Sequence, residues 1–503
     1  MRILFATSEA YPLAKTGGLA DVSRALPAAL QRLGADIRLI MPAYPRAVGQ
    51  LREPRVVAKL EPVMGVSDGI VLAGLFPDCD LPVYLVSSAS LFGRAGGLYQ
   101  DDNGQDWPDN AHRFAFLSQV ASDIALGHCD LGWQPDVVHA NDWHTGLLPL
   151  FLAHELGCRP KSVFTTHNMA FQGAFAPHEV PPLPLQSGDD LEFYGRLSYL
   201  KAGLAYGDRV TTVSPTYAQE ILTPEFGCGL DGVLRARQEV FSGILNGIDE
   251  DIWNPVTDPF LAANYRASDM LGKRACKVAL QHELNLDADP ETPLLGFVSR
   301  LTEQKMADTL IEALPFIVGQ NAQLVIVGEG DRSIEAKLKD AQTAYPAKIS
   351  VTIGYDEALA HKLQAGADIL LAPARFEPCG LTQLYALRYG TLPVVRRTGG
   401  LADTVVDANN QSILDRSASG FVFDDPSADS MVSALTRALA LYHDPLHWRR
   451  LQLQAMTRSF GWDRSARAYM ALYQELLGLP QQDDVKREHQ GGRTENAARR
   501  AAG

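Results

Sequence analysis

Short apolar runs alternate with amphipathic stretches through the first half of the chain. Residues 3–7 form a run typical of a buried strand, and after a polar loop residues 20–33 show the periodicity of a helix, which Gly34 ends. A second apolar run at residues 37–41 completes a strand–helix–strand unit, which implies a parallel sheet covered on both faces. Further buried strands are predicted at residues 136–139, 162–165 and 209–213.

The pattern changes near Asn246, and the segment from there to about Pro293 is polar and irregular. A second series of apolar runs follows, each succeeded by a loop and a helical pattern, at residues 294–298, 324–327, 349–353, 369–372 and 392–396. The sequence therefore predicts an α/β protein with two doubly wound domains joined near residue 246.

Composition narrows the class of protein. The 503 residues are 46% hydrophobic and 21% charged, which is typical of a globular chain with ample core, and the net charge of −14 argues against nucleic-acid binding. The apolar N-terminal run is soon followed by Ser8 and Glu9, so we interpret it as a strand rather than a signal peptide, and no uncharged stretch is long enough to span a membrane. The six cysteines show no CxxC pair and no metal-ligand spacing, which favours reduced thiols in the cytoplasm.

One motif occurs twice. The sequence KTGGLAD at residues 15–21 returns as RTGGLAD at residues 397–403, and each copy follows a predicted strand and opens a predicted helix. Matching strand–glycine–helix turns, one in each domain, predict two crevices at the carboxyl ends of two sheets. Two unrelated tight turns that use glycine for positive φ are the alternative.

Basic residues lie close to two of the predicted strand ends. Lys15, with the backbone amides of Gly17 and Gly18, has the makings of an anion site at a helix N-terminus. Arg300 and Lys305 follow the strand at 294–298 and are well placed to hold a diphosphate, with a solvated surface pair as the alternative.

Residues 375–382 form a third candidate element. Pro378 and Gly380 shape a turn after a buried strand, and a helix is predicted to start near Leu381, so the amides of Gly380, Leu381 and Thr382 predict another phosphate site. Glu377 lies beside it, where a carboxylate can stabilise positive charge that develops on a sugar ring. Alternatively, Glu377 caps the helix and Cys379 is a small buried residue.

Histidines end two strands of the first domain. His139, Asp142 and His144 in one loop, and His167 with Asn168 in the next, have the residue types of a metal site but lack the helical spacing of one. We interpret His167 and Asn168 as donors to sugar hydroxyls, with a structural histidine as the alternative.

Taken together, four motifs resemble those of the bacterial glycogen synthase and plant starch synthase family, and the resemblance runs from residue 1 to about 475. The motifs are KTGGL at 15–19, SRLTxQK at 299–305, EPCGL at 377–381 and RTGGL at 397–401. The resemblance implies a GT-B fold, in which two doubly wound Rossmann-like domains face a central cleft. It also implies ADP-glucose as donor, an α-1,4-glucan such as glycogen as acceptor, retention of configuration, and neither metal nor cofactor.

The resemblance also divides the chain. Residues 1–245 would form the acceptor and catalytic domain and residues 246–460 the nucleotide-sugar-binding domain. A helix within residues 461–480, near 462–477, would cross back onto the first domain. The polar tail at residues 481–503 is predicted to be disordered.

By the same resemblance, each candidate residue has a role. Lys15, Arg300 and Lys305 would hold the donor phosphates, and Tyr355, whose aromatic face suits a base, would stack on the adenine. The catalytic residues would be Glu377, Cys379 and His167. The glucosyl group and the rest of the substrate would be bound by Asp21, Asp142, Asn168 and Asn246, together with Gly17, Gly18, Gly380, Leu381 and Thr382.

Four positions depart from the family pattern. Asn141 stands where histidine is usual, Ala374 replaces a common serine, and Phe92 stands where an acceptor-contacting tyrosine is expected. Met306 replaces the glycine that follows the lysine, a glycine that could serve a positive φ.

Rival functions come from other classes. A nicotinamide oxidoreductase would need GxGxxG, and residues 328–333 (GEGDRS) lack the third glycine. A sugar-nucleotide epimerase of the same fold would release free sugar without an acceptor. A glucan phosphorylase would need a pyridoxal lysine, which no feature demands, and a silent binding protein would hold ADP-glucose without turnover.

Overall fold

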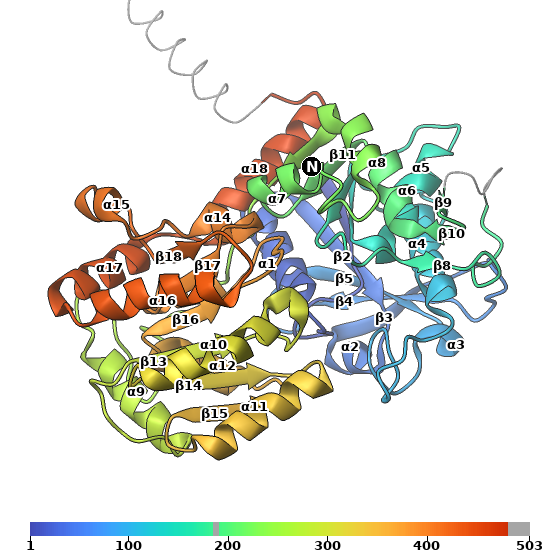
Figure 1. The fold of residues 1–503 in the computed structure, drawn as a ribbon. Coiled ribbons are helices and arrows are strands. Elements are labelled where there is room, and N and C mark those ends of the chain that lie inside the picture. Colours follow the sequence, from blue (N-terminus) through green and yellow to red (C-terminus); the bar gives the residue numbers. More distant parts are fainter. Residues whose placement is uncertain (185–190, 481–503) are drawn as a thin grey trace, which may run out of the picture. The chain divides into compact units, whose positions relative to one another are not determined.

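The computed structural model describes residues 1–184 and 191–480, which divide into two compact units (Figure 1). Unit 1 contains the described residues of 1–212, 221–244 and the segment from Trp462 onwards. Unit 2 contains residues 213–220 and 245–461. The tail predicted to be disordered at 481–503 lies outside the described residues.

Unit 1 is built on a nine-stranded sheet of order β12-β11-β7-β6-β1-β2-β5-β4-β3. Its strands from β12 to β5 pair in parallel, whereas β3, β4 and β5 pair antiparallel at one edge. Ile3, Leu4 and Phe5 in β1 are all fully buried, because both faces of the sheet are covered. The strands are β1 (Arg2–Ala6), β2 (Asp36–Pro42), β3 (Arg52–Lys59), β4 (Ile70–Leu75), β5 (Pro82–Ser87), β6 (Val137–Asn141), β7 (Lys161–Thr166), β11 (Arg209–Thr212) and β12 (Phe241–Gly243), with a small separate sheet of β8 (Ala174–Phe175), β9 (Glu192–Phe193) and β10 (Arg196–Ser198).

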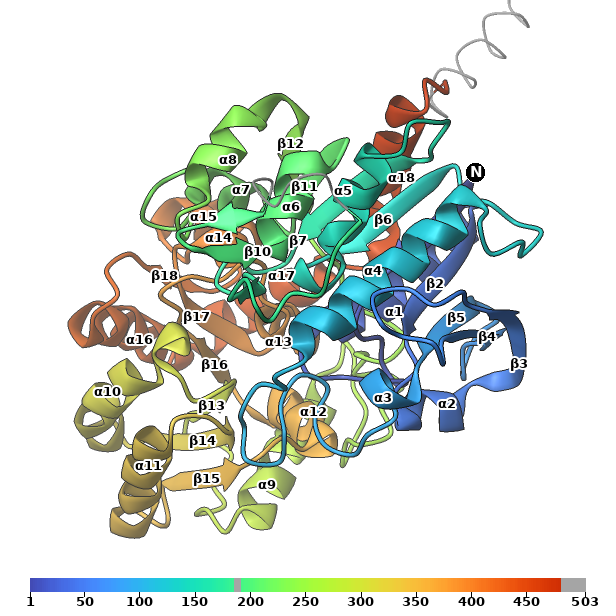
Figure 2. The ribbon, with the colours of Figure 1, turned by 90° about the vertical axis from the view of Figure 1, so that its right-hand side faces the viewer.

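Helices cover this sheet, and the last of them returns from the end of the described chain (Figure 2). α18 (Trp462–Leu476) packs against α1 (Gly18–Arg32), and the hydroxyl of its Tyr473 lies 2.7 Å from His139 Nδ1 in β6. The other helices of the unit are α2 (Pro45–Gln50), α3 (Ala89–Phe92), α4 (Asn110–Leu126), η1 (Trp143–Thr145), α5 (Leu147–Ala153), α6 (Tyr199–Tyr206), α8 (Asp231–Ala236) and η2 (Gln238–Val240).

Unit 2 is built on a six-stranded parallel sheet of order β15-β14-β13-β16-β17-β18. Alternate residues of its strand β14 enter different cores: Leu324 and Ile326 pack in one cluster, and Val325 and Val327 in another. This alternation places a helix layer on each face of the sheet. The strands are β13 (Leu294–Val298), β14 (Gln323–Gly328), β15 (Ile349–Ile353), β16 (Ile369–Ala372), β17 (Leu392–Arg396) and β18 (Phe421–Phe423).

The helices of unit 2 follow its strands in sequence. One cluster contains residues of α10, α11, α16 and α17, and the cluster on the other face contains residues of α9 and α12. The helices are α7 (Pro215–Glu220), α9 (Leu271–Glu283), η3 (Glu303–Lys305), α10 (Ala307–Gly319), α11 (Arg332–Ala344), α12 (Glu357–Gly366), α13 (Thr382–Tyr389), α14 (Gly399–Thr404), α15 (Asn410–Leu414), α16 (Ala428–Tyr442) and α17 (Pro445–Thr457). None of the described helices is both long and apolar enough to cross a membrane.

The α/β prediction with two Rossmann-like domains is confirmed, but parts of the pattern were misjudged. All five strands predicted for the second series are present, and all the boundaries predicted for the N-terminal strand–helix–strand unit lie within two residues of those observed. The irregular segment predicted for residues 246–293 contains the helix α9, whose buried face carries Lys273, Lys277 and Gln281 beside Cys276 and Leu280. Strands β3 to β5 were not among the predicted strands.

Candidate active site

Each sheet contains a switch point, which is a place where the chain leaves two neighbouring strands toward opposite faces of the sheet. In unit 1, β1 pairs with both β2 and β6, and in unit 2, β13 pairs with both β14 and β16. In open α/β sheets, ligands bind at the carboxyl ends of the strands beside such a point. The loops after β1 and β6, and those after β13 and β16, are therefore the regions in which each unit is expected to hold a ligand.

The loop after β1 contains the first copy of the repeated motif. Lys15 Nζ lies 3.0 Å from Asp21 Oδ1, in an ion pair that is partly exposed. The carboxylate of Glu9 accepts hydrogen bonds from the amides of Thr16 and Gly17, the latter at 3.3 Å. Burial raises the pKa of Glu9 to about 8, so its carboxyl group is largely neutral at pH 7.

The Gly17 amide, predicted as part of an anion site, is thus already bonded to a side chain of the same unit. The amide of Gly18 opens helix α1, where no intrahelical carbonyl can accept its hydrogen. The donors that face an incoming anion in this loop are therefore Lys15 and the start of the helix rather than the whole turn.

The loop after β6 orients the loop after β7. Asp142 has φ of 59°, an uncommon conformation for a residue other than glycine, and its Oδ1 accepts a hydrogen bond of 3.0 Å from the amide of His167. The amide of Asn168 also bonds to this carboxylate. Burial nevertheless raises the pKa of Asp142 to about 7. Asp142 therefore acts here by holding the His167–Asn168 backbone.

Asn141 fixes the proton position on the His167 ring. Its amide nitrogen faces two carbonyl oxygens, of Ala6 at 3.1 Å and His139 at 3.3 Å, so its Oδ1 must be the atom that lies 3.1 Å from His167 Nε2. His167 therefore carries its proton on Nε2, and burial lowers its pKa to about 3, so the ring is neutral. Its Nδ1 is left as an acceptor, which changes the sequence-based interpretation of this side chain as a hydrogen-bond donor.

The other histidines of these loops lie apart from His167. His139 is bonded between Tyr473 and the Thr165 hydroxyl at 2.6 Å, and the His144 ring stacks on Trp143 at 3.9 Å. Within residues 1–184 and 191–480, no group of three or more His, Cys, Asp or Glu side chains is arranged to hold a metal ion.

In unit 2, the loop after β13 meets the loop after β16. Lys305 Nζ pairs with Glu377 Oε2, and the two side chains are 20% and 12% exposed. Arg300 Nη2 lies 3.2 Å from Gln304 Oε1 on the same loop. A basic and an acidic group thus share the switch point, where a phosphate could displace the carboxylate as the partner of Lys305.

Met306, the residue that replaces a glycine, adopts φ of 53° and ψ of 34°. This is the left-handed conformation that the glycine would have supplied, and it costs a side chain about 1–2 kcal/mol. The Met306 side chain is fully buried in the core with Leu301 and Leu310. Burial offsets the backbone cost, so the loop keeps its conformation without glycine.

The turn that carries Glu377 is held by its backbone carbonyl groups. The carbonyl oxygens of Phe376, Glu377 and Pro378 accept hydrogen bonds from the Gln304 side chain, the Gly400 amide and the Ser214 hydroxyl. Those of Cys379 and Gly380 both accept from the Gln383 side chain. Gly380 has φ of 72°, and the helix that follows begins with Thr382, with Leu381 as its N-cap. The turn is consequently rigid on the side away from the Glu377 carboxylate.

Cys379 belongs to this turn, and Asn246 lies beside it. The backbone amide of Asn246 hydrogen-bonds to the Cys379 thiol, and burial raises the pKa of this thiol to about 12. A neutral, buried thiol is suited to lining a reaction centre and not to nucleophilic attack. The side-chain oxygen of Asn246 is buried with no hydrogen-bond partner among the described residues, as expected of a group that awaits a ligand.

Tyr355 lies beyond the end of β15 and is 57% exposed. It follows Gly354, whose φ is 112°, and its hydroxyl bonds to the carboxylate of Glu357 at the start of α12. The ring is therefore fixed at one end while its face is open to stacking.

The remaining two departures lie in the core. Phe92 is 1% exposed and packs edge-on against Tyr44, and Ala374 is fully buried. Phe92 is thus a core residue and not a substitute for an acceptor-contacting tyrosine.

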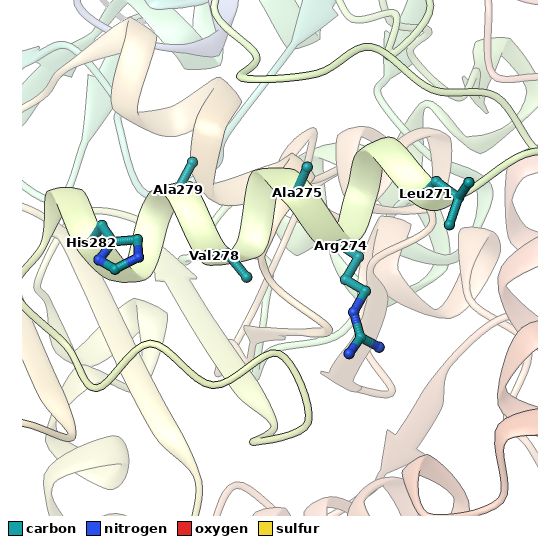
Figure 3. Close-up of a pocket in the computed structure, with 6 residues that line it drawn as sticks. All are labelled: Leu271, Arg274, Ala275, Val278, Ala279 and His282. Carbon is teal, nitrogen blue, oxygen red and sulfur yellow. The ribbon is translucent and has the colours of Figure 1, made fainter.

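A shallow groove of unit 2 involves none of these residues. It follows one face of α9 and is lined by Leu271, Arg274, Ala275, Val278, Ala279 and His282 (Figure 3). Because no predicted site residue lines it, it belongs to a different part of the unit.

The sequence did not single out three features of these loops. They are the Glu9 carboxyl group at the first copy of the motif, the hydrogen bond by which Asn141 fixes the His167 tautomer, and the Glu220 carboxylate, which bonds to the second copy. Glu9 could have been found by the rule that singled out His167, since it also follows a buried strand. Glu220 carries no such signal, because it lies far from residue 399 in sequence.

Comparisons with known proteins agree with this geometry. Residues 2–236 match the family model described as "Starch synthase catalytic domain", and residues 282–451 match the one described as "Glycosyl transferases group 1". A glycogen synthase from Burkholderia thailandensis is 52% identical over 481 residues, covering 94% of this chain and 90% of that protein. Glycogen synthase 1 from Methylococcus capsulatus is 49% identical over 483 residues, covering 95% and 97%.

Comparison with solved structures gives the same family and fold. The catalytic domain of starch synthase IV from Arabidopsis thaliana, bound to ADP and acarbose, has a TM-score of 0.85 at 32% identity and covers 95% of this chain and 99% of its own. Sucrose-phosphate synthase from Thermosynechococcus elongatus, with a TM-score of 0.58 at 18% identity, shares the fold alone. Two glycosyltransferase domains of GT-B fold thus define the class. The chain belongs to the family of bacterial glycogen synthases and plant starch synthases.

Proposed function

We propose that this enzyme transfers glucose from ADP-glucose to the non-reducing end of an α-1,4-glucan, with retention of configuration and release of ADP. The observation that carries the proposal is the Lys305–Glu377 ion pair at the switch point of unit 2. A donor phosphate that takes Lys305 as its partner leaves the Glu377 carboxylate to face the sugar, where positive charge develops as the bond to phosphate breaks.

The donor's remaining groups find partners of matching chemistry. Lys15, Arg300 and Lys305 neutralise the diphosphate, helped by the amides at Gly380, Leu381 and Thr382. The exposed face of Tyr355 stacks on the adenine.

The glucosyl group needs donors and acceptors for its hydroxyls. Asn246 Oδ1 and His167 Nδ1 are acceptors, and Asp21 and Asn168 complete the set, with Asp142 holding the His167–Asn168 backbone. Hydrogen-bonding groups of this kind suit the hydroxyls of a sugar.

One assay tests the proposal against its rivals. The purified protein is incubated with ADP-glucose, with and without glycogen, and both ADP and free sugar are measured. ADP release that requires glycogen supports the transferase. Free sugar without acceptor identifies an epimerase-type reaction, and ADP-glucose binding without turnover identifies a silent binding protein. UDP-glucose in a parallel reaction tests the choice of nucleotide.

We further propose that the reaction takes place in the cytoplasm and requires no divalent metal, because the basic side chains supply the charge that a metal would otherwise bring to the phosphates. Turnover is expected to persist at the same rate in excess EDTA. A rate that collapses in chelator and returns with magnesium or manganese would contradict this part of the proposal.

A further inference from the structure

The second copy of the repeated motif, residues 397–403, has no role in the proposed function, and its contacts differ from those of the first copy. In the first copy, Lys15 pairs with Asp21. In the second, the corresponding Arg397 and Asp403 have separate partners. Arg397 Nε pairs with Asp424 at 2.7 Å, and Asp403 accepts hydrogen bonds from the amide and hydroxyl of Thr216 at 2.9 and 2.7 Å.

The glycines of the two copies also have different neighbours. No described heavy atom lies within 4 Å of the position that a Cβ on Gly17 would take. A Cβ on Gly399, whose φ is 42°, would lie 1.9 Å from the carbonyl oxygen of Glu377, and a Cβ on Gly400 would lie 2.1 Å from that of Cys379. The second copy therefore packs directly on the turn that carries Glu377.

Hydrogen bonds complete this contact. The Gly400 amide donates to the Glu377 carbonyl at 3.1 Å. The Thr404 hydroxyl donates to the Gly400 carbonyl at 2.6 Å and lies 3.2 Å from Gln383 Nε2, which itself donates to the carbonyls of Cys379 and Gly380. The glycines let α14 approach close enough to make these bonds.

As Glu9 does at the Gly17 amide of the first copy, a carboxylate from α7 accepts a hydrogen bond from the corresponding amide of this copy. Glu220 Oε1 accepts hydrogen bonds of 2.9 Å from both the Gly399 amide and the Thr398 hydroxyl. At the other end of α7, the Ser214 hydroxyl donates to the Pro378 carbonyl at 2.6 Å. The segment 213–220 thus clamps both the motif and the Glu377 turn, and all of these residues belong to unit 2.

We infer that the second copy of the motif is not a second ligand site but a positioning element for Glu377, and that Glu220 is the positioning residue that holds it there. This inference rests on the proposed role of Glu377. The repeated sequence then has two uses: the first copy leaves space for a ligand, and the second uses the same glycines for contact with the catalytic turn.

Three variants test the inference at the second copy itself. Gly400→Ala forces a Cβ against Cys379 and is expected to lower kcat about 10²-fold, because a displacement of about 1 Å at a reacting group has that effect. Glu220→Ala leaves the Gly399 amide unpaired and is expected to lower kcat about tenfold. Glu220→Gln keeps an acceptor oxygen and is expected to restore kcat, which a role for the negative charge would not allow. In all three variants the donor KM is expected to change little.

Arg397→Gln tests the alternative that the second copy of the motif is itself a ligand site. Its guanidinium is exposed and paired with Asp424, so the change is expected to leave kcat and donor KM unaltered. Lys15→Gln, at the corresponding position of the first copy, is expected to raise donor KM. An Arg397→Gln variant with an equally raised donor KM would overturn the inference.

A second readout does not depend on turnover. Cys379 is buried in the positioned turn, and its rate of alkylation, followed by mass spectrometry of its peptide, reports whether the turn has moved. Glu220→Ala is expected to speed this alkylation at least about tenfold through local opening, while the buried Cys276 stays protected. Glu220→Gln is expected to show the original rate. Unchanged protection of Cys379 in Glu220→Ala would refute the inference, whether or not the protein uses ADP-glucose. Failure of the unaltered protein to use ADP-glucose would refute only the proposed function.

Discussion

The switch-point loops of unit 1 hold buried ionisable side chains as well as the Lys15–Asp21 ion pair, whereas those of unit 2 present the Lys305–Glu377 ion pair. Burial shifts Glu9, Asp142 and His167 toward their neutral forms, with pKa values of about 8, 7 and 3. In unit 2, the Lys305 side chain pairs with the Glu377 carboxylate. The difference predicts a division of labour, in which the buried neutral groups of unit 1 suit the hydroxyls of a sugar. Lys15 and the Lys305–Glu377 pair of unit 2 suit phosphate and the charge that develops in the reaction.

The largest effect is expected from removing the charge of Glu377. Glu377→Gln keeps the size of the side chain but cannot stabilise positive charge on the sugar, so kcat is expected to fall by roughly 10²-fold or more. ADP should still bind, because Lys305 is then released to the phosphates. The measurements are glycogen-dependent ADP release and calorimetric titration with ADP.

Glu329→Gln, which changes an exposed carboxylate of the same unit, is the control. A Glu377→Gln variant with near-normal kcat would remove the contrast between the units and reduce Glu377 to a structural role.

On the unit 1 side, Asn141→Ala tests the hydrogen bond that fixes the His167 tautomer. Loss of one neutral hydrogen bond is worth about 1 kcal/mol, so kcat/KM is expected to fall roughly fivefold. The 15N chemical shifts of the His167 ring should move from a pure Nε2–H form to a mixture.

Thr145→Ala is a matched control for that experiment. It removes a hydroxyl that donates to the Asn141 carbonyl at 2.9 Å without touching His167. Ring shifts that indicate Nδ1–H in the unaltered protein would show that the assignment is wrong.

The raised pKa of Glu9 predicts a pH dependence of donor binding. Below about pH 8 the carboxyl group is neutral, and above it a negative charge forms beside the amides of Thr16 and Gly17. Because that charge repels the donor phosphates, donor KM is expected to rise about threefold to tenfold between pH 7 and 9. Glu9→Gln should abolish the rise, and Glu61→Gln, at an exposed position, should not. A rise that persists in Glu9→Gln belongs to another group.

A smaller effect is expected at Met306, where a side chain occupies a left-handed conformation in unit 2. Met306→Ala and Met306→Gly lose the same buried packing, but glycine also relieves the backbone, so the glycine variant should be more stable by about 1 kcal/mol. At Leu310, in the interior of α10, the order should reverse, since glycine is about 1 kcal/mol less favourable than alanine in a helix. Thermal unfolding of the four variants measures both differences, and the same order at both positions would contradict the assigned strain.

The sequence was most informative where strands are buried on both faces. The strands β13, β15, β16 and β17 have the predicted bounds, because their continuous apolar runs follow from burial on both sides. The edge strand β3 is largely exposed and carries Arg52, Pro54 and Lys59, so its composition gives no such run. α9 was taken for irregular chain because its buried face carries Lys273, Lys277 and Gln281, which interrupt the apolar periodicity of a helix.

The residues of the candidate site likewise fall into those that could be predicted from sequence and those that could not. Residues that follow buried strands, such as Lys305 and His167, could be singled out from sequence because strand ends are where α/β proteins bind ligands. The partners that set their chemistry could not be found in this way. Whether Lys305 pairs with Glu377, or Asn141 with His167, depends on contacts between separate loops, and no spacing along the chain encodes them.

The return of α18 to unit 1 has a consequence for the order in which the chain can fold. Tyr473 must meet His139, which lies 334 residues earlier, and the ribosome releases all of unit 2 before it releases this helix. Unit 2 can therefore complete its core while the face of unit 1 that α18 covers is still bare. During synthesis, this face of unit 1 therefore has to be protected from aggregation until α18 has been made and can pack on it.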